Sequence, residues 1–514
     1  MKILALALVA AGFAAAQAPK PAPAKPKLLL AIVVDQFRYD YLTRFRSEYN
    51  SGLHRLLTQG AVFTNANYEH YPTLTAVGHS TFLTGASPLT SGIVANDWYE
   101  AESGAVVSSV NDKKLKLLGA DTDASSPHRL MVSTIPDEIK MSAKGEAKAI
   151  GISIKDRSAI LPVGRMADAA YWFSNEAGQF VTSTWYMKAM PKWVDDFNAK
   201  RPGERYIGKP WIPLAGGAPL KTMLTKPDTM FYSNLEKSPF CNELLEEFAE
   251  LAIENEKLGT HAGIDTLSLS LSGNDYVGHA HGPDSPEVRD VSIRTDRLLG
   301  KLFAYIDKKI GMRNVVVVLT ADHGVGPVPE VNAARKMPGV RFKDKDFADA
   351  VEKALKAKYG YEKWTVGKNS QQMYLEPKLL AKYNAEEVRK TAADALRNLP
   401  HVMRVYTKDQ ILRGEIPQDK FARKIVNGFH PTRSSDIVVM MAPYSIFSTD
   451  KATHGTVYSY DTHVPILLMG PGIKPGKYHV PAAVNDIAPT LATLLEVETP
   501  AGSMGRVLVE ALVP

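Results

Sequence analysis

The run KLLLAIVVD, residues Lys27–Asp35, places seven apolar residues between a lysine and an aspartate. Unbroken apolar runs of this kind are typical of strands in a parallel sheet that helices cover on both faces. An acid at the carboxyl end of such a strand points into the crevice where α/β sheets bind ligands. The run therefore predicts an α/β fold with a central, mostly parallel sheet. It also makes Asp35 a candidate metal ligand, and a helix N-cap is its alternative role.

A second apolar strand, Ile264–Ser272, leads at once into GNDYVGH, which begins at Gly273. Asp275 and His279 stand four residues apart in this motif, just past the strand end. Carboxylate oxygen and imidazole nitrogen are donors that a zinc ion takes. Both are therefore candidate ligands, although His281 could replace His279.

The clearest buried strand of the chain, Asn314–Leu319, runs into TADHG. Asp322 and His323 again place an acid and an imidazole at a strand end. Three predicted strands now end in carboxylates, and two of them have a histidine alongside. This convergence is far more specific than any one of the three motifs, and it predicts a metal site.

A small hydroxyl residue, Thr75, follows a proline-containing segment and precedes Ala76–Leu83, which can begin as a helix. Unpaired N–H groups and a partial positive charge at a helix N-terminus favour an anion, or an oxygen that must lose its proton. Thr75 is thus a candidate nucleophile, and a simple N-cap is the alternative. Asn96 could return an amide donor to this corner, although a turn asparagine with purely local bonds would be preferred without the other motifs.

A pair of cations, Lys155 and Arg157, interrupts the strand-like segment Ala149–Gly164. Strand alternation would place both side chains on one face, without an acid at the next alternate position. Two such cations favour an anion site. A solvated edge strand protected by charge is the alternative.

The composition is that of an ordinary globular protein with ample material for a large core: 514 residues, 45% hydrophobic and 23% charged. We expect one catalytic domain over residues 27–514, with cap insertions at about 165–235 and 326–435. The net charge of +6 comes from scattered basic residues, which disfavours a nucleic-acid partner. No oligomeric state is favoured.

The first residues, MKILALALVAAGFAAAQ, have the pattern of a secretory signal peptide, which we expect to be residues 1–16. Residues 17–26 read as an extended tether rich in proline, alanine and lysine. No later segment offers the ~20 apolar residues of a membrane span. The sequence therefore predicts a periplasmic or secreted protein without an integral membrane span.

Together the motifs resemble those of the alkaline phosphatase superfamily, in its phosphatase and phosphodiesterase branch with a threonine nucleophile. The resemblance covers about residues 27–495 and implies an α/β/α sandwich with inserted cap segments. It rests on the strand that ends at Asp35, TAVGH from Thr75, GNDYVGH from Gly273, ADHG from Ala321, and HGTVYSYDTHVP from His454.

The resemblance implies two zinc ions per chain, about 4 Å apart. It assigns Asp275, His279 and His454 to one ion. It assigns Asp35, Asp322 and His323 to the other, which would also bind the Thr75 oxygen. His463 precedes the same predicted strand, Val464–Met469, and is the alternative to His454; Thr73 is the alternative to Thr75.

Family members with a Lys-x-Arg pair after the nucleophile, and an asparagine about twenty residues past it, resemble phosphate-monoester hydrolases. Lys155, Arg157 and Asn96 match this pattern. Two cations and an amide suit a dianionic phosphoryl group, whose oxygens need neutralising. The expected enzyme is an alkaline phosphatase that hydrolyses small phosphate monoesters through a phospho-threonine intermediate.

Three other functions compete with this prediction. A phosphodiesterase or nucleotide pyrophosphatase of the same superfamily would typically lack the Lys-x-Arg pair. A phosphoethanolamine-type transferase would normally need transmembrane helices. A non-catalytic exported binding protein, stabilised by zinc, would need no nucleophile at the position of Thr75.

Overall fold

The computed structural model describes residues 25–360, 363–367 and 371–513. The predicted signal peptide, residues 1–16, lies outside this range, as does the predicted tether apart from its last two residues. In the part of the chain that is described, no helix has the length and apolar character needed to cross a membrane.

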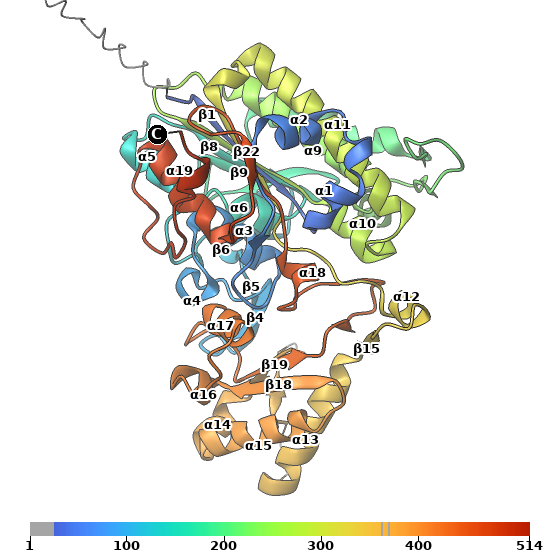
Figure 1. The fold of residues 1–514 in the computed structure, drawn as a ribbon, viewed down its shortest axis with the longest axis vertical. Coiled ribbons are helices and arrows are strands. Elements are labelled where there is room, and N and C mark those ends of the chain that lie inside the picture. Colours follow the sequence, from blue (N-terminus) through green and yellow to red (C-terminus); the bar gives the residue numbers. More distant parts are fainter. Residues whose placement is uncertain (1–24, 361–362, 368–370, 514) are drawn as a thin grey trace, which may run out of the picture.

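An eleven-stranded sheet forms the centre of the fold (Figure 1). Its five middle strands, β14, β1, β13, β8 and β9, pair in parallel, whereas β21 and β10 pair antiparallel to β14 and β9 on either side. All of β1 is buried, which explains the unbroken apolar run. The strands follow the order β22 (Gly476–Tyr478), β2 (Ala61–Phe63), β21 (Ile466–Met469), β14 (Val315–Thr320), β1 (Leu28–Val34), β13 (Asp265–Leu271), β8 (Ala149–Ser153), β9 (Ala169–Ser174), β10 (Gln179–Ser183), β6 (Asn111–Leu118) and β7 (Asp123–Ser125).

Helices pack on both faces of the sheet (Figure 1). One group consists of α2 (Gly52–Gln59), α9 (Phe240–Asn255) and α11 (Pro286–Lys309). The other consists of α3 (Thr75–Thr84), α5 (Ile135–Ser142), α6 (Asp156–Ile160) and α19 (Ile487–Leu495). This layering confirms the predicted α/β sandwich with a mostly parallel central sheet.

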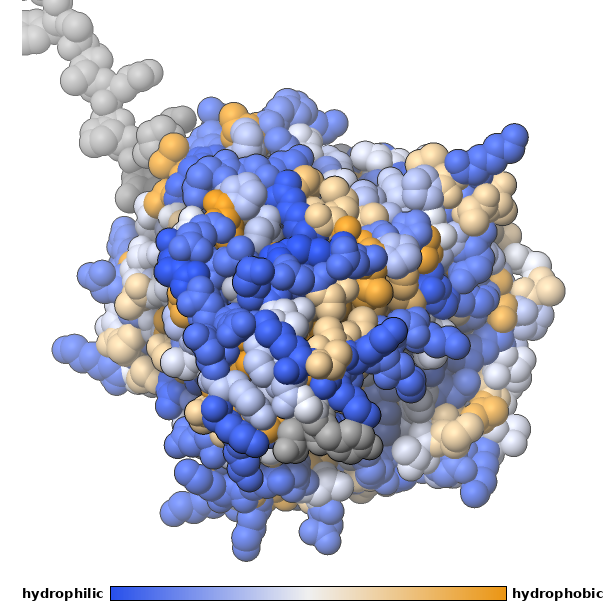
Figure 2. Space-filling model, turned by 90° about the horizontal axis from the view of Figure 1, so that it is seen from below, coloured by the Kyte–Doolittle hydropathy of each residue, from blue (hydrophilic) through white to orange (hydrophobic). Residues whose placement is uncertain are grey.

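A second, smaller layer, which we call the cap (residues 329–447), lies below the sheet in Figure 1. Its four-stranded sheet has the order β16 (Thr365–Val366), β17 (Gln372–Leu375), β19 (Ile437–Met441) and β18 (Val402–Thr407). Helices α13 (Asp344–Tyr359) and α15 (Ala385–Arg397) cover this sheet, and they bury Trp364 in a separate hydrophobic core. Seen from the cap end, the surface is mostly hydrophilic and its hydrophobic residues gather in small groups (Figure 2).

The two segments predicted as insertions, about 165–235 and 326–435, differ in structure. The first contributes β9 and β10 to the main sheet before it continues into α7 (Lys192–Ala199) and α8 (Thr229–Glu236). The second contains most of the cap, which ends later, at β20 (Ser445–Phe447). β20 pairs with β15 (Val340–Phe342) and closes the cap.

Candidate active site

Four neighbouring parallel strands deliver polar side chains to one edge of the main sheet. Asp322 and His323 follow β14, and Asp35 follows β1. Asp275 lies in α10 (Gly273–His281) directly after β13, and Lys155 comes shortly after β8. Because the carboxyl ends of parallel strands meet at the same edge, residues far apart in the sequence converge there.

His323 stands at the centre of the first group of candidate metal ligands. Its Nε2 atom lies 3.6 Å from Asp35 Oδ1 and 3.3 Å from Asp322 Oδ2. The Thr75 hydroxyl oxygen is 3.4 Å from the same nitrogen. All four residues are buried, so the three predicted ligands and the predicted nucleophile share one enclosed space.

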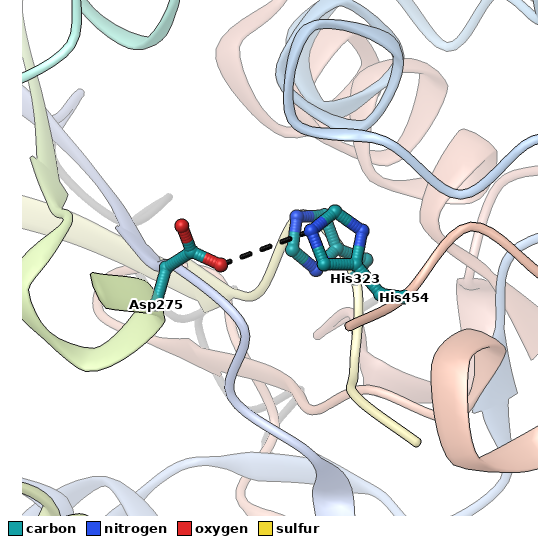
Figure 3. A group of neighbouring side chains, drawn as sticks. All are labelled: Asp275, His323 and His454. Carbon is teal, nitrogen blue, oxygen red and sulfur yellow. Dashed lines mark ion pairs between the residues drawn. The ribbon is translucent and has the colours of Figure 1, made fainter. Parts of the chain in front are cut away.

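Asp275 is the meeting point of the second group. Its Oδ1 atom lies 3.1 Å from His279 Nε2 and 3.8 Å from His454 Nε2. The His454 ring stacks on His323 with 3.4 Å between ring centroids, and Figure 3 shows Asp275 facing this pair. The two groups are therefore adjacent.

The three histidines present the same ring nitrogen to the site. In each, Nδ1 lies within hydrogen-bond distance of a backbone carbonyl: Gly324 for His323, Thr73 for His454 and Ala452 for His279, at 2.9, 2.8 and 2.8 Å. An Nδ1–H bond of this kind fixes the tautomer that leaves Nε2 with a free lone pair, as a metal ligand requires. Burial also lowers the pKa of His323 and of His454, which keeps these rings neutral.

The donor set fits metal ions. Burial and the nearby Asp322 carboxylate raise the pKa of Asp35 well above its usual range. Its Oδ1 atom is buried and makes no hydrogen bond to any residue that the structure describes. Buried carboxylate oxygens are normally bonded, so clustered acids with an orphaned oxygen and free imidazole nitrogens are suited to divalent cations.

His463 lies apart from these groups. Its Nε2 is 3.0 Å from the Thr64 carbonyl, and its ring stacks on Tyr39 with centroids 4.5 Å apart. His281 lies beside Glu287, with 3.2 Å between Nδ1 and Oε1. The structure thus brings His454 and His279, rather than these two alternatives, to Asp275.

This placement predicts different outcomes for two alanine variants. His454→Ala should lose one bound metal ion per chain and nearly all activity, because a ligand nitrogen facing Asp275 disappears. His463→Ala should retain both the metal and the activity, since its ring stacks on Tyr39 and its Nε2 lies beside the Thr64 carbonyl, away from Asp275. Metal analysis of the two purified variants makes the comparison, and metal loss confined to His463→Ala would move the ligand to His463.

Lys155 and Arg157 do not lie on one strand as the alternation suggested. β8 ends at Ser153, Lys155 is the N-cap of α6, and Arg157 lies in its first turn. Lys155 also has acidic partners, which come from distant parts of the sequence. Its ammonium nitrogen is 2.6 Å from Asp35 Oδ2 and 2.6 Å from Asp275 Oδ2.

These contacts keep Lys155 charged. Burial would lower its pKa, but Asp275 and Asp35 together raise the pKa above the usual range. The side chain is thus a built-in cation between the two groups of ligands. Arg157 is less engaged: its nearest carboxylate, Asp156, is 3.9 Å away, and its buried Nε has no hydrogen-bond partner within the described residues.

Asn96 is anchored beside the nucleophile. Its Oδ1 accepts a 2.8 Å hydrogen bond from the backbone N–H of Ala76, in the first turn of α3. Thr75 is the first residue of this helix. Since the amide oxygen is used in this way, the side-chain NH₂ remains to donate to a ligand.

Sequence reasoning missed Gln36. This buried residue donates from Nε2 to Asp275 Oδ1 at 2.6 Å, and from its backbone N–H to Asp322 Oδ1 at 3.1 Å. It therefore connects the two groups of ligands. Its backbone has a φ of 62°, which is unusual for a residue with a side chain, and nothing in a single sequence marks that conformation.

Comparison with known proteins places this geometry among phosphate-ester enzymes. A family model described as type I phosphodiesterase / nucleotide pyrophosphatase matches residues 29–464. The alkaline phosphatase PafA of Elizabethkingia meningoseptica is 34% identical, with 95% of each chain covered. The alkaline phosphatase PhoV of Synechococcus elongatus is 36% identical over 95% of this chain and 93% of that protein. A crystal structure of PafA superposes with a TM-score of 0.89 at 34% identity, covering 95% of this chain and 99% of that one.

Proposed function

Because the chain belongs to the type I phosphodiesterase / nucleotide pyrophosphatase family, we propose that it is an alkaline phosphatase that hydrolyses small phosphate monoesters. The relatives PafA and PhoV are alkaline phosphatases. The observation that carries the proposal is the placement of Lys155 among the candidate metal ligands, with Arg157 two residues on. A dianionic phosphoryl group needs this extra positive charge more than a diester does.

Thr75 acts as the nucleophile in this proposal. Its oxygen attacks phosphorus, the phosphorus–oxygen bond to the leaving group breaks, and a phospho-threonine forms. Water then attacks the phosphorus, which releases inorganic phosphate and restores the hydroxyl. The N-terminus of α3 favours negative charge on this oxygen.

Two zinc ions, one held by Asp35, Asp322 and His323 and the other by Asp275, His279 and His454, would lower the pKa of the Thr75 hydroxyl and stabilise the leaving oxygen. Other side chains of the protein position the phosphoryl group. Lys155 and Arg157 neutralise the non-bridging oxygens, and the Asn96 NH₂ donates to one of them. Gln36 donates hydrogen bonds to both Asp275 and Asp322, and these bonds fix the two carboxylates relative to each other.

We also propose that the protein is exported from the cytoplasm. Residues 1–16 have the charge, apolar run and small residues of a cleavable signal peptide, so we place the mature enzyme in the periplasm or outside the cell. Its partners would be small phosphate monoesters rather than nucleic acid.

Activity on a matched pair of substrates tests the function. The purified enzyme should hydrolyse phenyl phosphate with a kcat/KM at least about a hundredfold above that for diphenyl phosphate, or ~2.7 kcal/mol. A preference for the diester would favour a phosphodiesterase instead. Failure to turn over either substrate in the presence of zinc would favour the non-catalytic binding protein.

A further inference from the structure

A cleft of about 260 Å³ opens between the main sheet and the cap, next to the candidate active site. Asn96 and His454 line one side, and Leu74, the residue before Thr75, also lines it. Cap residues line the opposite side, among them Tyr374 of β17 and Phe447 of β20. An ester substituent that leaves phosphorus at Thr75 therefore has this cleft directly beside it.

We propose that the cleft binds the leaving group, and that it selects monoesters whose leaving group is uncharged and carries an aromatic ring. This inference rests on the proposed phosphatase function and names the substrate class of that site. Three properties of the cleft carry it: its charge, its aromatic walls and its volume.

The described side chains that line the cleft are suited to an uncharged group. Among its described lining residues there is no lysine or arginine. Phosphate and carboxylate groups bind where arginine or lysine can donate to them. A substrate with a second phosphate would gain no such partner from these described residues.

The aromatic residues form a wall that is held in place. The rings of Tyr444 and Tyr460 stack with 5.3 Å between centroids, and the Tyr444 backbone N–H donates to the Tyr460 hydroxyl at 3.0 Å. Tyr374 donates from its hydroxyl to the Arg433 carbonyl at 3.1 Å. Fixed rings of this kind bind a flat apolar group at low entropic cost.

The volume limits the size of the group. Clefts that enclose drug-sized ligands measure roughly 300–1,000 Å³, so a cleft of about 260 Å³ suits one ring system. A phenol and the base of a nucleoside share this chemistry. The cap is tied to the nucleophile segment by Tyr71, whose hydroxyl bonds the Val439 carbonyl at 2.7 Å, which keeps the wall at a set place beside Thr75.

The test compares leaving groups in variants that remove one ring each. We choose Tyr444→Asn, because asparagine tolerates the positive φ of 64° at this position, and Tyr374→Leu, which keeps apolar volume. Kinetics with phenyl phosphate, adenosine 5′-monophosphate and methyl phosphate should show kcat/KM falling about fivefold to tenfold for the ring-bearing substrates. Methyl phosphate, which reaches the nucleophile without filling the cleft, should change by less than about twofold.

The same substitution at a cap tyrosine remote from the cleft, Tyr383→Asn, is the matched control, because this ring packs on Tyr359 and Trp364 instead. This variant should leave kcat/KM unchanged for all three substrates. A loss on phenyl phosphate alone would assign the cleft to small aryl groups, and a loss on both ring-bearing substrates would extend it to nucleosides. Equal losses on methyl and phenyl phosphate, or no loss at all, would overturn the inference and leave the phosphatase function intact. Absence of monoesterase activity in the unaltered enzyme would instead overturn the proposed function.

Discussion

Replacing Thr75 by alanine should lower the turnover of phenyl phosphate by roughly 10⁴-fold or more, because no other described side chain replaces the nucleophilic oxygen. The bound metal should remain near two ions per chain. Asp35, Asp322 and His323 would still supply three donors at the first group, and Thr75 contributes only one oxygen at 3.4 Å from His323. Steady-state kinetics and metal analysis of the same preparation measure both quantities.

Thr73→Ala is the control for this variant. The Thr73 hydroxyl donates to the Thr456 carbonyl at 2.9 Å and is fully buried. Its loss should cost about 1 kcal/mol of folding stability, with turnover changed by less than about fivefold. If Thr73→Ala were inactive and Thr75→Ala active, the nucleophile would have to be reassigned to Thr73.

The sequence predicted the parts of the fold that follow from local patterning. The apolar runs before Asp35, Asp275 and Asp322 marked buried strands, because a strand covered on both faces must be apolar along its whole length. Their shared parallel direction then brought the three carboxylates to one edge. The helix at Thr75 was also predicted from its local signals.

Contacts between distant segments could not be predicted in this way. The ion pairs of Lys155 with Asp35 and Asp275 span 120 residues in each direction and depend on the order of strands in the sheet. The alternation rule failed at Arg157 because α6 begins at Asp156, where an acid in the first turn stabilises the helix N-terminus. The cleft likewise combines segments from the main sheet and from the cap.

The combined variant Lys155→Ala/Arg157→Ala tests the substrate class. A charge-assisted contact to a phosphoryl oxygen contributes about 1.5–3 kcal/mol net. Losing both should lower kcat/KM for phenyl phosphate by roughly 10² to 10⁴. Hydrolysis of diphenyl phosphate, which has one negative charge fewer, should fall much less, so the preference for the monoester should shrink or invert.

The structure separates two contributions within this double variant. Lys155→Ala also removes the cation between Asp35 and Asp275, so its metal content must be measured beside its kinetics. Arg157→Ala affects neither carboxylate and should by itself lower monoester kcat/KM by about 10- to 100-fold at full metal content.

The double variant Lys188→Ala/Lys200→Ala is the control, because it removes the same net charge from two exposed lysines. It should change kcat/KM for either substrate by less than about twofold. Two outcomes would contradict this assignment: an equal loss of monoester and diester activity in the Arg157 variant with intact metal, or an exposed-lysine control that matches the double variant. Either outcome would mean that Lys155 and Arg157 act through folding or general anion attraction. The monoester assignment would then lose its main support.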